Sequence, residues 1–112
     1  WLAHRHRKGL PISIIEDEAR SAVWADDLAG RLWQLIDSDR TGLVHLPATR
    51  TMNRIELATR LMLHQHLQPN FRRERRNDQP HPHLGRITLQ TGRDDLLTQP
   101  LPSIGDTLPP MP

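Results

Sequence analysis

Histidine pairs are the first feature of this sequence that invites chemistry, because imidazole can bind a metal ion or move a proton near neutral pH. Most of the 7 histidines occur in pairs separated by one residue: His4 and His6, His64 and His66, His81 and His83. On a helix, residues two positions apart point about 200° away from each other, so His64 and His66 would lie on opposite faces and could not easily bind the same metal ion. Any pair also falls short of the roughly four ligands that zinc requires. We expect solvent-exposed histidines, and keep only the loop pair His81 and His83 as candidate substrate contacts.

A second feature is a cluster of closely spaced arginines: Arg72, Arg73, Arg75 and Arg76. Such a cluster could bind the phosphates of RNA or of a nucleotide sugar. Phe71 is the one aromatic residue nearby, too few for base stacking. The favoured interpretation is a charged edge strand exposed to solvent, with contact of one arginine to a diphosphate second and nucleic acid a weak third.

Several catalytic groups are missing from the composition. The chain has no tyrosine and no cysteine, and Lys8 is its single lysine. A phenol acting as general acid is therefore excluded, as are disulfides and thiolate metal sites. The 6 glycines are scattered without the spacing of a phosphate-binding loop at a helix start. We nominate no catalytic, cofactor-binding or metal-binding residue.

The overall composition is that of a folded protein, with 36% apolar and 25% charged residues in 112 positions. This length predicts one domain, or a piece of one, with a modest core. The formal net charge of +2 does not argue for a nucleic-acid partner, and no apolar run approaches the roughly 20 residues that span a bilayer. We expect a cytoplasmic protein with no membrane partner, which continues upstream because the first residue is not Met.

The first half of the chain predicts two helices and two strands. A helix ends at Gly9, residues 11–15 form a short strand, and residues 16–21 form a polar turn. A helix is expected to begin at Trp24 and to bury Trp24 and Trp33 in the core. Asp27 and Arg31, four residues apart on this helix, are placed to form an ion pair. Residues 43–46 read as a buried strand. The apolar stripe of the second helix is Trp24, Leu28, Leu32, Leu35 and Ile36.

The second half predicts a capped helix and a weaker C-terminal region. Asn53 caps the helix, Glu56 reaches back in a capping box, and the helix ends near His66. Its apolar face is Ile55, Ala58, Leu61 and Met62. Residues 71–76 predict an edge strand, and residues 87–89 an apolar segment after a Pro-rich linker. Thr91 and Asp94 repeat the cap spacing before a short helix containing Leu96 and Leu97.

Four segments, in order along the chain, each match a short motif, and their combination is more specific than any one of them. The first, Pro11-Ile-Ser-Ile-Ile-Glu-Asp-Glu-Ala-Arg-Ser-Ala-Val-Trp-Ala-Asp-Asp-Leu-Ala29, is similar to a strand, a turn and a helix opening with Asp-Leu-Ala. Gly42-Leu-Val-His-Leu resembles a Gly-x-Tyr-His strand, and Asn53-Arg-Ile-Glu-Leu-Ala58 a Ser-x-x-Glu-Phe-Ala helix start. Leu89-Gln-Thr91 resembles a Leu-Asp-Thr/Ser motif that begins a last helix. In this order, the four segments resemble the landmarks of the dTDP-4-dehydrorhamnose reductase family, in the extended short-chain dehydrogenase/reductase superfamily.

The resemblance implies an α/β fold: most of the small substrate-binding lobe of such an enzyme, with about three helices and three or four short strands. The cofactor-binding Rossmann part is absent. Residues 1–8 would be the end of a helix continuing from a missing upstream region, residues 9–99 the lobe, and residues 100–112 a Pro-rich extended or disordered tail.

The implied function is sugar-nucleotide binding in a reductase that transfers hydride from NAD(P)H to a 4-keto deoxysugar nucleotide. The family's Tyr-x-x-x-Lys pair and Gly-rich loop are not in this chain, so it is not catalytic alone and NAD(P)H is expected in the parent enzyme only. The substrate-binding candidates are Glu18, Arg20, His83 and Arg86.

These candidates lie where the sequence departs from the family pattern. Glu18 replaces a glutamine and Arg20 a glycine, while His83 and Leu84 stand where an Arg-Pro pair is expected. Arg86 is the nearest guanidinium to that pair. The departures leave the particular sugar nucleotide open.

An alternative from another class is a non-catalytic interaction subunit, because members of this fold group also serve as regulatory partners of methionine adenosyltransferase. In the family the strand at residues 43–46 joins the sheet of the cofactor domain. Without those neighbours, we expect its apolar edge to drive self-association, as a homodimer or a larger species.

Overall fold

The computed structural model describes residues 1–91 and 95–112. Within these ranges it contains three α-helices and four short strands in two small sheets, which confirms the expected mixed α/β content. The elements are α1 (Leu2–Arg7), β1 (Ser13–Ile15), β2 (Ala19–Ser21), α2 (Ala25–Ile36), β3 (Thr51–Asn53), α3 (Arg54–His64) and β4 (Arg72–Glu74). No described helix is long and apolar enough to cross a membrane.

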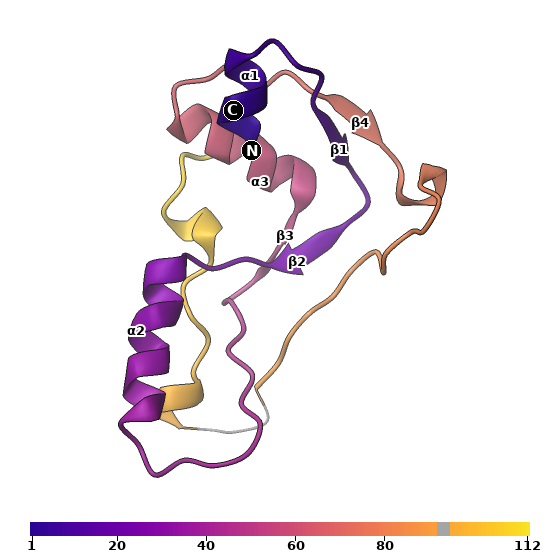
Figure 1. Cartoon of the computed structure of the whole chain (residues 1–112). Helices are drawn as coiled ribbons and strands as arrows, with labels where there is room; N and C mark the ends of the chain where they lie inside the picture. Colours follow the sequence, from indigo (N-terminus) through magenta and orange to yellow (C-terminus); the bar gives the residue numbers. More distant parts are fainter. Residues whose placement is uncertain (92–94) are drawn as a thin grey trace.

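The main core lies between α3 and the sheet formed by β1 and β4, which pair in parallel (Figure 1). Alternation in and before β1 turns Ile12 and Ile14 inward and Ser13 outward. α3 contributes the rest of the cluster, and its Met62 is fully buried. This cluster, here called the α3 core, is Ile12, Ile14, Ile55, Ala58 and Met62.

The structure confirms one part of the prediction for the start of α3, the Asn53 cap. Asn53 has extended backbone, and its Oδ1 accepts a hydrogen bond from the Ile55 amide at 2.7 Å, as predicted. The predicted capping box is wrong, because the Glu56 carboxylate instead pairs with Arg50 and Arg60, each at 3.1 Å. Two opposite charges attract that carboxylate more strongly than one backbone amide does.

A second core cluster includes side chains of residues 100–112, the segment expected to form a Pro-rich extended or disordered tail. Ile104 and Leu108 from this segment are buried against Met52 of β3. Leu101 is also buried, and its amide donates to the Pro47 carbonyl at 2.8 Å. Proline limits regular hydrogen bonding but does not prevent apolar side chains from packing, so a Pro-rich segment can still complete a core.

Helix α2 forms where the apolar spacing predicts it, but its packing differs from the prediction. None of its residues is buried, and Trp33, expected in the core, is 73% exposed. Trp24 is partly buried beside the second cluster, where its Nε1 donates to Thr107 Oγ1 at 2.7 Å. Arg31 does not pair with Asp27; it donates to the carbonyl oxygens of Leu97 and Gln99 instead.

Two further segments differ from the sequence-based expectation. Residues 43–46 form no strand, and Leu43 is 80% exposed, because no described segment supplies the backbone partners that a strand needs. Residues 16–21 are a turn only in their first half; residues 19–21 form β2, which pairs with β3 in antiparallel register. The cross-strand pairing of Ala19 with Asn53 therefore begins directly after Glu18.

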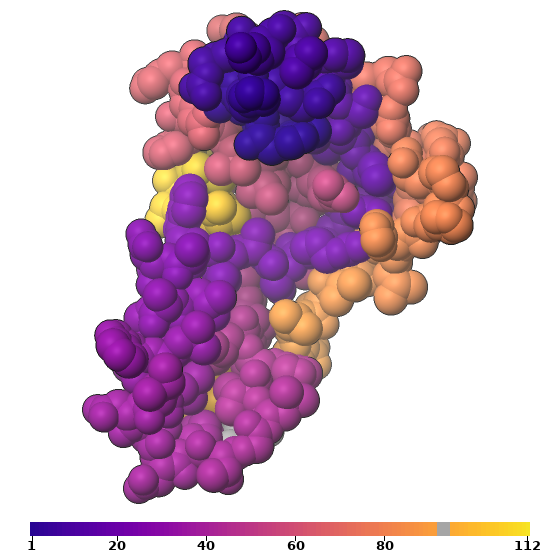
Figure 2. Space-filling view, in the orientation of Figure 1, coloured from indigo at the N-terminus to yellow at the C-terminus, as the bar shows by residue number. Residues whose placement is uncertain are grey.

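The C-terminal helix prediction is met by a single 3-10 turn, Leu96–Thr98, whose cap is Asp95. Of the predicted cap pair Thr91 and Asp94, Asp94 lies outside the described residues. Residues 25–46, here called the α2 arm, project from the α3 core in Figure 2. The radius of gyration is 16.4 Å, against the roughly 13 Å typical of a domain of about 100 residues, so the shape is elongated.

Candidate functional site

Three chain segments meet around Glu18. The first is the turn that leads from β1 into β2, the second is the junction of β3 and α3, and the third is the loop at residues 83–86. Backbone hydrogen bonds fix the arrangement: the Arg54 amide donates to the Glu18 carbonyl at 3.0 Å, and the Ala19 amide to the Gly85 carbonyl at 2.8 Å. Segments more than 30 residues apart in sequence are thereby held around one carboxylate.

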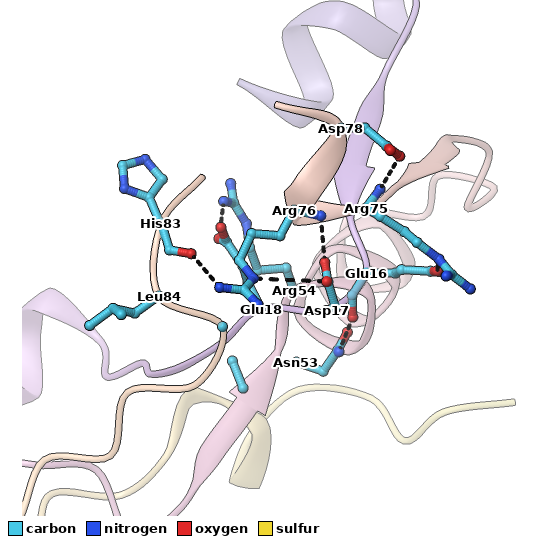
Figure 3. A network of polar contacts seen from close by, with 12 residues as sticks. Glu16, Asp17, Glu18, Asn53, Arg54, Arg75, Arg76, Asp78, His83 and Leu84 are labelled. Carbon is cyan, nitrogen blue, oxygen red and sulfur yellow. Dashed lines mark hydrogen bonds and ion pairs between the residues drawn. The ribbon is translucent and has the colours of Figure 1, made fainter. Parts of the chain in front are cut away.

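Glu18 is a buried acidic residue with an uneven set of partners. Its side chain is 2% exposed, and its Oε2 accepts a hydrogen bond from Arg54 Nη1 at 2.8 Å (Figure 3). Arg20 Nη2 lies 3.8 Å from the same oxygen. The other oxygen, Oε1, is buried and has no hydrogen-bond partner among the described residues. Buried carboxylate oxygens are seldom left unpaired, so this atom needs an explanation.

Arg20 holds the loop rather than presenting a free guanidinium. Its Nη1 donates to the carbonyls of Ala19 and Gly85, and its Nη2 donates to the carbonyl of Leu84 at 2.8 Å. These bonds clamp the loop against β2. We assign Arg20 the role of a positioning residue, because most of its donors are already used.

Two of the predicted candidates come from the loop, and they face different surroundings. His83 is exposed and lines the same cavity as Glu18 and Arg20, while its backbone carbonyl accepts from Arg76 (Figure 3). Arg86 does not line that cavity; its Nη2 donates to Thr51 Oγ1 at 2.6 Å. Three of the four predicted substrate-binding residues therefore line one cavity, whereas Arg86 pairs with Ala19 through its backbone and directs its side chain to Thr51.

Arg54 is the residue of this site that sequence reasoning missed. It is the first residue of α3, its side chain is 46% exposed, and it pairs with Glu18 across 36 positions of sequence. Its Nη2 and Nε have no hydrogen bond to another described residue. No local pattern connects Arg54 to Glu18, because their contact depends on how β3 pairs with β2.

The cavity at these residues has a volume of about 330 Å³. Apolar groups of Ala22, Met52 and Leu57 form one part of its lining, and the polar part consists of Glu18, Arg20, Arg54 and His83. Its size is at the lower end for small-molecule sites, enough for one sugar ring but not for a whole sugar nucleotide. The half-exposed Arg54 guanidinium, which uses one nitrogen for Glu18, can donate hydrogen bonds to a group that accepts them.

The arginine cluster around β4 is matched by nearby acids. Arg72 hydrogen-bonds to Glu74, and this bond lowers the pKa of the Glu74 carboxyl below its ordinary value. Arg75 Nε lies 3.2 Å from Glu16, and the Arg76 amide donates to Asp17 at 2.7 Å. β4 pairs only with β1 among the described strands. The cluster therefore fits the charged edge strand better than a phosphate-binding surface.

The two longer helices, α2 and α3, do not begin with a Gly-rich phosphate-binding loop. The α3 N-terminus, where a phosphate could be cradled, is occupied by the Asn53 side chain, and α2 begins after Trp24 rather than after a glycine loop. No three histidine or acidic side chains of the described residues converge on a metal-binding geometry.

Comparison of the chain with models of known protein families, with curated proteins and with solved structures finds no match.

Proposed function

We propose that this chain is the sugar-nucleotide-binding part of an NAD(P)-dependent reductase similar to dTDP-4-dehydrorhamnose reductase. The observation that carries the proposal is the convergence of Glu18, Arg20 and His83 on one cavity. Glu18 and Arg20 come from one segment and His83 from another, more than 60 residues away, and all three stand at positions of the family pattern.

The chain's own part in this function is binding and orientation of the substrate. Hydride would come from the cofactor of the parent enzyme, and proton transfer would need a group that this chain, without tyrosine, does not supply. The cavity would hold part of the ligand next to the missing cofactor domain. Binding by this lobe alone should be weak, roughly millimolar, because half of the contacts are absent.

A titration with dTDP-glucose, followed by amide NMR, tests the proposal. Signals of Glu18, Ala19, Arg54 and His83 should shift together, with one dissociation constant. His83→Ala should weaken binding only slightly, because the ring is exposed at the edge of the cavity. His81→Ala is the matched control, since His81 is an exposed neighbour that does not line the cavity.

Two outcomes would contradict the proposal. One is the absence of shifts at millimolar dTDP-glucose, and the other is shifts confined to residues 100–112. Either result would favour the regulatory-subunit alternative, in which the same fold group binds a protein instead of a nucleotide sugar.

A further inference from the structure

The two ends of the elongated chain differ in charge. Its principal axes measure 49 × 31 × 24 Å, and α1 lies at the opposite end from the α2 arm (Figure 2). Residues 1–15 include three basic residues, Arg5, Arg7 and Lys8, and no aspartate or glutamate. None of the three forms an ion pair with another described residue. The α1 end therefore carries positive charge that no acid of the described chain compensates.

The α2 arm is the acidic end. Its two arginines are held by the C-terminal segment, Arg31 by carbonyl oxygens and Arg40 by Asp95. Its aspartates are exposed and form no ion pair with a described residue: Asp26, Asp27, Asp37 and Asp39. Opposite charges at the two ends of one molecule favour contact between the α1 end of one copy and the arm of another.

A groove of about 420 Å³ lies on this arm, lined by Trp33, Gln34, Ile36 and Asp37. Trp33 and Asp37 are four residues apart at the end of α2, so the ring and the carboxylate lie on the same side of the helix. An aromatic ring attracts a cation, and a carboxylate beside it accepts hydrogen bonds from a guanidinium. The apolar surface of Ile36 suits the methylene stem of an arginine. The groove therefore fits an arginine side chain better than an acidic or a purely apolar one.

Arg7 is the arginine of the α1 end that is free to enter such a groove. It is exposed, and its side chain makes no hydrogen bond or ion pair with a described residue. Arg5, in contrast, donates to the Pro11 carbonyl at 2.7 Å and lies 5.5 Å from the centroid of the Trp1 ring. The contact with Trp1 is an example, within the chain, of the arginine–tryptophan pair that Arg7 would make with Trp33 of another copy.

We infer that copies of this chain associate head to tail, with Arg7 of one copy bound between Trp33 and Asp37 of the next. A symmetric contact of two arms would instead bring their aspartates together, and like charges repel. A contact between two different surfaces continues into a row of copies or closes into a ring. This association uses none of the residues that line the cavity at Glu18, and it does not depend on the proposed function.

Sedimentation equilibrium of the unmodified chain at two sodium chloride concentrations is the first test. Raising the salt from about 0.1 M to about 1 M shortens the screening length from about 10 Å to about 3 Å. The association constant should therefore fall about tenfold, whereas an association driven by apolar contacts alone should not weaken. A chain that stays monomeric at high micromolar concentration and low salt, or that associates as strongly at high salt, would overturn the inference.

Two single variants remove opposite halves of the contact. Trp33→Ser removes the ring of the groove, and Arg7→Glu reverses the charge that enters it, so neither variant should associate with itself. Their mixture should form a complex of two chains, because the Trp33→Ser chain keeps its Arg7 and the Arg7→Glu chain keeps its groove. Circular dichroism should show unchanged secondary structure in both variants, since both side chains are exposed. Arg73→Glu is the matched control: it makes the same change in net charge at an exposed arginine outside α1 and should leave the association unchanged.

The outcomes distinguish this contact from other modes of association. Recovery of association in the mixture supports the head-to-tail contact, because a symmetric contact of two arms is not restored by mixing these variants. If Arg7→Glu associates as strongly as the unmodified chain while Trp33→Ser does not, the two arms pair with each other and the inference is overturned. A mixture that stays monomeric, although the unmodified chain associates, overturns it as well.

Discussion

The α3 core and the α2 arm are built from similar amphipathic helices but are held in different ways. In the α3 core, Met62 and its apolar neighbours are buried between a helix and a sheet. In the α2 arm, no helix residue is buried, and the links to the rest of the chain are polar: Arg31 to two carbonyls and Arg40 to Asp95 at 2.6 Å. Figure 1 shows α2 running alongside the C-terminal segment rather than across a sheet.

This difference shows that an amphipathic pattern specifies a helix but not what covers it. Apolar burial contributes about 25 cal/mol per Å², and the arm gains little of it, so its stability depends on polar contacts that compete with water. The cavity lined by Glu18 and Arg54 lies on the side of the well-packed region, beside β2, β3 and the start of α3. Buried apolar side chains therefore support this site, whereas the helix of the arm has none.

Truncating the α3 core should have the largest effect on stability. Met62 is fully buried, so Met62→Ala removes apolar contacts and leaves a cavity, at a cost of about 2–5 kcal/mol. Urea unfolding followed by circular dichroism measures this cost. A decrease in the free energy of unfolding below about 1 kcal/mol would mean that the α3 core is packed no more tightly than the α2 arm. That result would contradict the difference between the two regions.

Two glycines give a paired test with opposite signs. A Cβ at Gly105 would collide with Arg50 Nη2 and lie 2.8 Å from Sδ of Met52, which is buried and has little room to move, so Gly105→Ala should cost about 1–3 kcal/mol. A Cβ at Gly30, in the middle of α2, meets nothing within 4 Å. Gly30→Ala should therefore stabilise the arm by up to about 1 kcal/mol through helix propensity. Thermal midpoints of the two variants that move in the same direction would contradict this prediction.

Removing the helix cap should have a moderate effect. Asn53 accepts from the Ile55 amide and also donates through Nδ2 to the Glu16 carbonyl, which ties α3 to the turn before Glu18. Asn53→Ala should cost about 1–2 kcal/mol, and Asn53→Asp, which keeps the cap but not the donor, should cost less. Equal unfolding midpoints for Asn53→Ala and the unmodified chain would show that the cap contributes nothing.

Asp95 makes the arm sensitive to acid. Desolvation raises the pKa of Asp95, but the hydrogen bond and charge of Arg40 outweigh it and hold the pKa below its ordinary value. The ion pair therefore stabilises the arm above the ordinary pKa of an aspartate, and this contribution is lost as pH falls through the lowered value. Amide exchange in α2 should accelerate at acid pH in the unmodified chain. In Asp95→Asn the exchange rates, corrected for their intrinsic pH dependence, should show no such step.

Local patterns in the sequence predicted the elements that depend on neighbouring residues. The end of α1 at Gly9, the apolar spacing of α2 and the Asn53 cap all rest on contacts within a few positions. Partners far apart in sequence were not predictable in this way. Arg54 meets Glu18 because β3 pairs with β2, and the segment from Pro100 enters the core through Ile104 and Leu108, which cluster with Met52.

The outcome for residues 43–46 has the same cause. Apolar residues there predict a buried strand, but a strand forms only where another segment offers backbone groups, and no described segment does so. The candidate site was predictable only in part. Glu18, Arg20 and His83 came from a resemblance, whereas the unpaired Glu18 oxygen could be recognised only from the burial and hydrogen bonds of the folded chain.

Changing the exposed side of the arm should have the smallest effect on stability. Trp33 is 73% exposed and Ile36 is 71% exposed, so Trp33→Ser should change the free energy of unfolding by no more than about 0.5 kcal/mol. The same substitution should reduce self-association, because exposed apolar side chains gain most by contact with another chain. Sedimentation equilibrium of the unmodified chain and the variant measures this directly. Met111→Ser is the control, since Met111 is an exposed apolar residue outside the arm. If Trp33→Ser instead unfolds the chain, α2 is packed in solution in a way that its exposure does not show, and the contrast between the arm and the core must be abandoned.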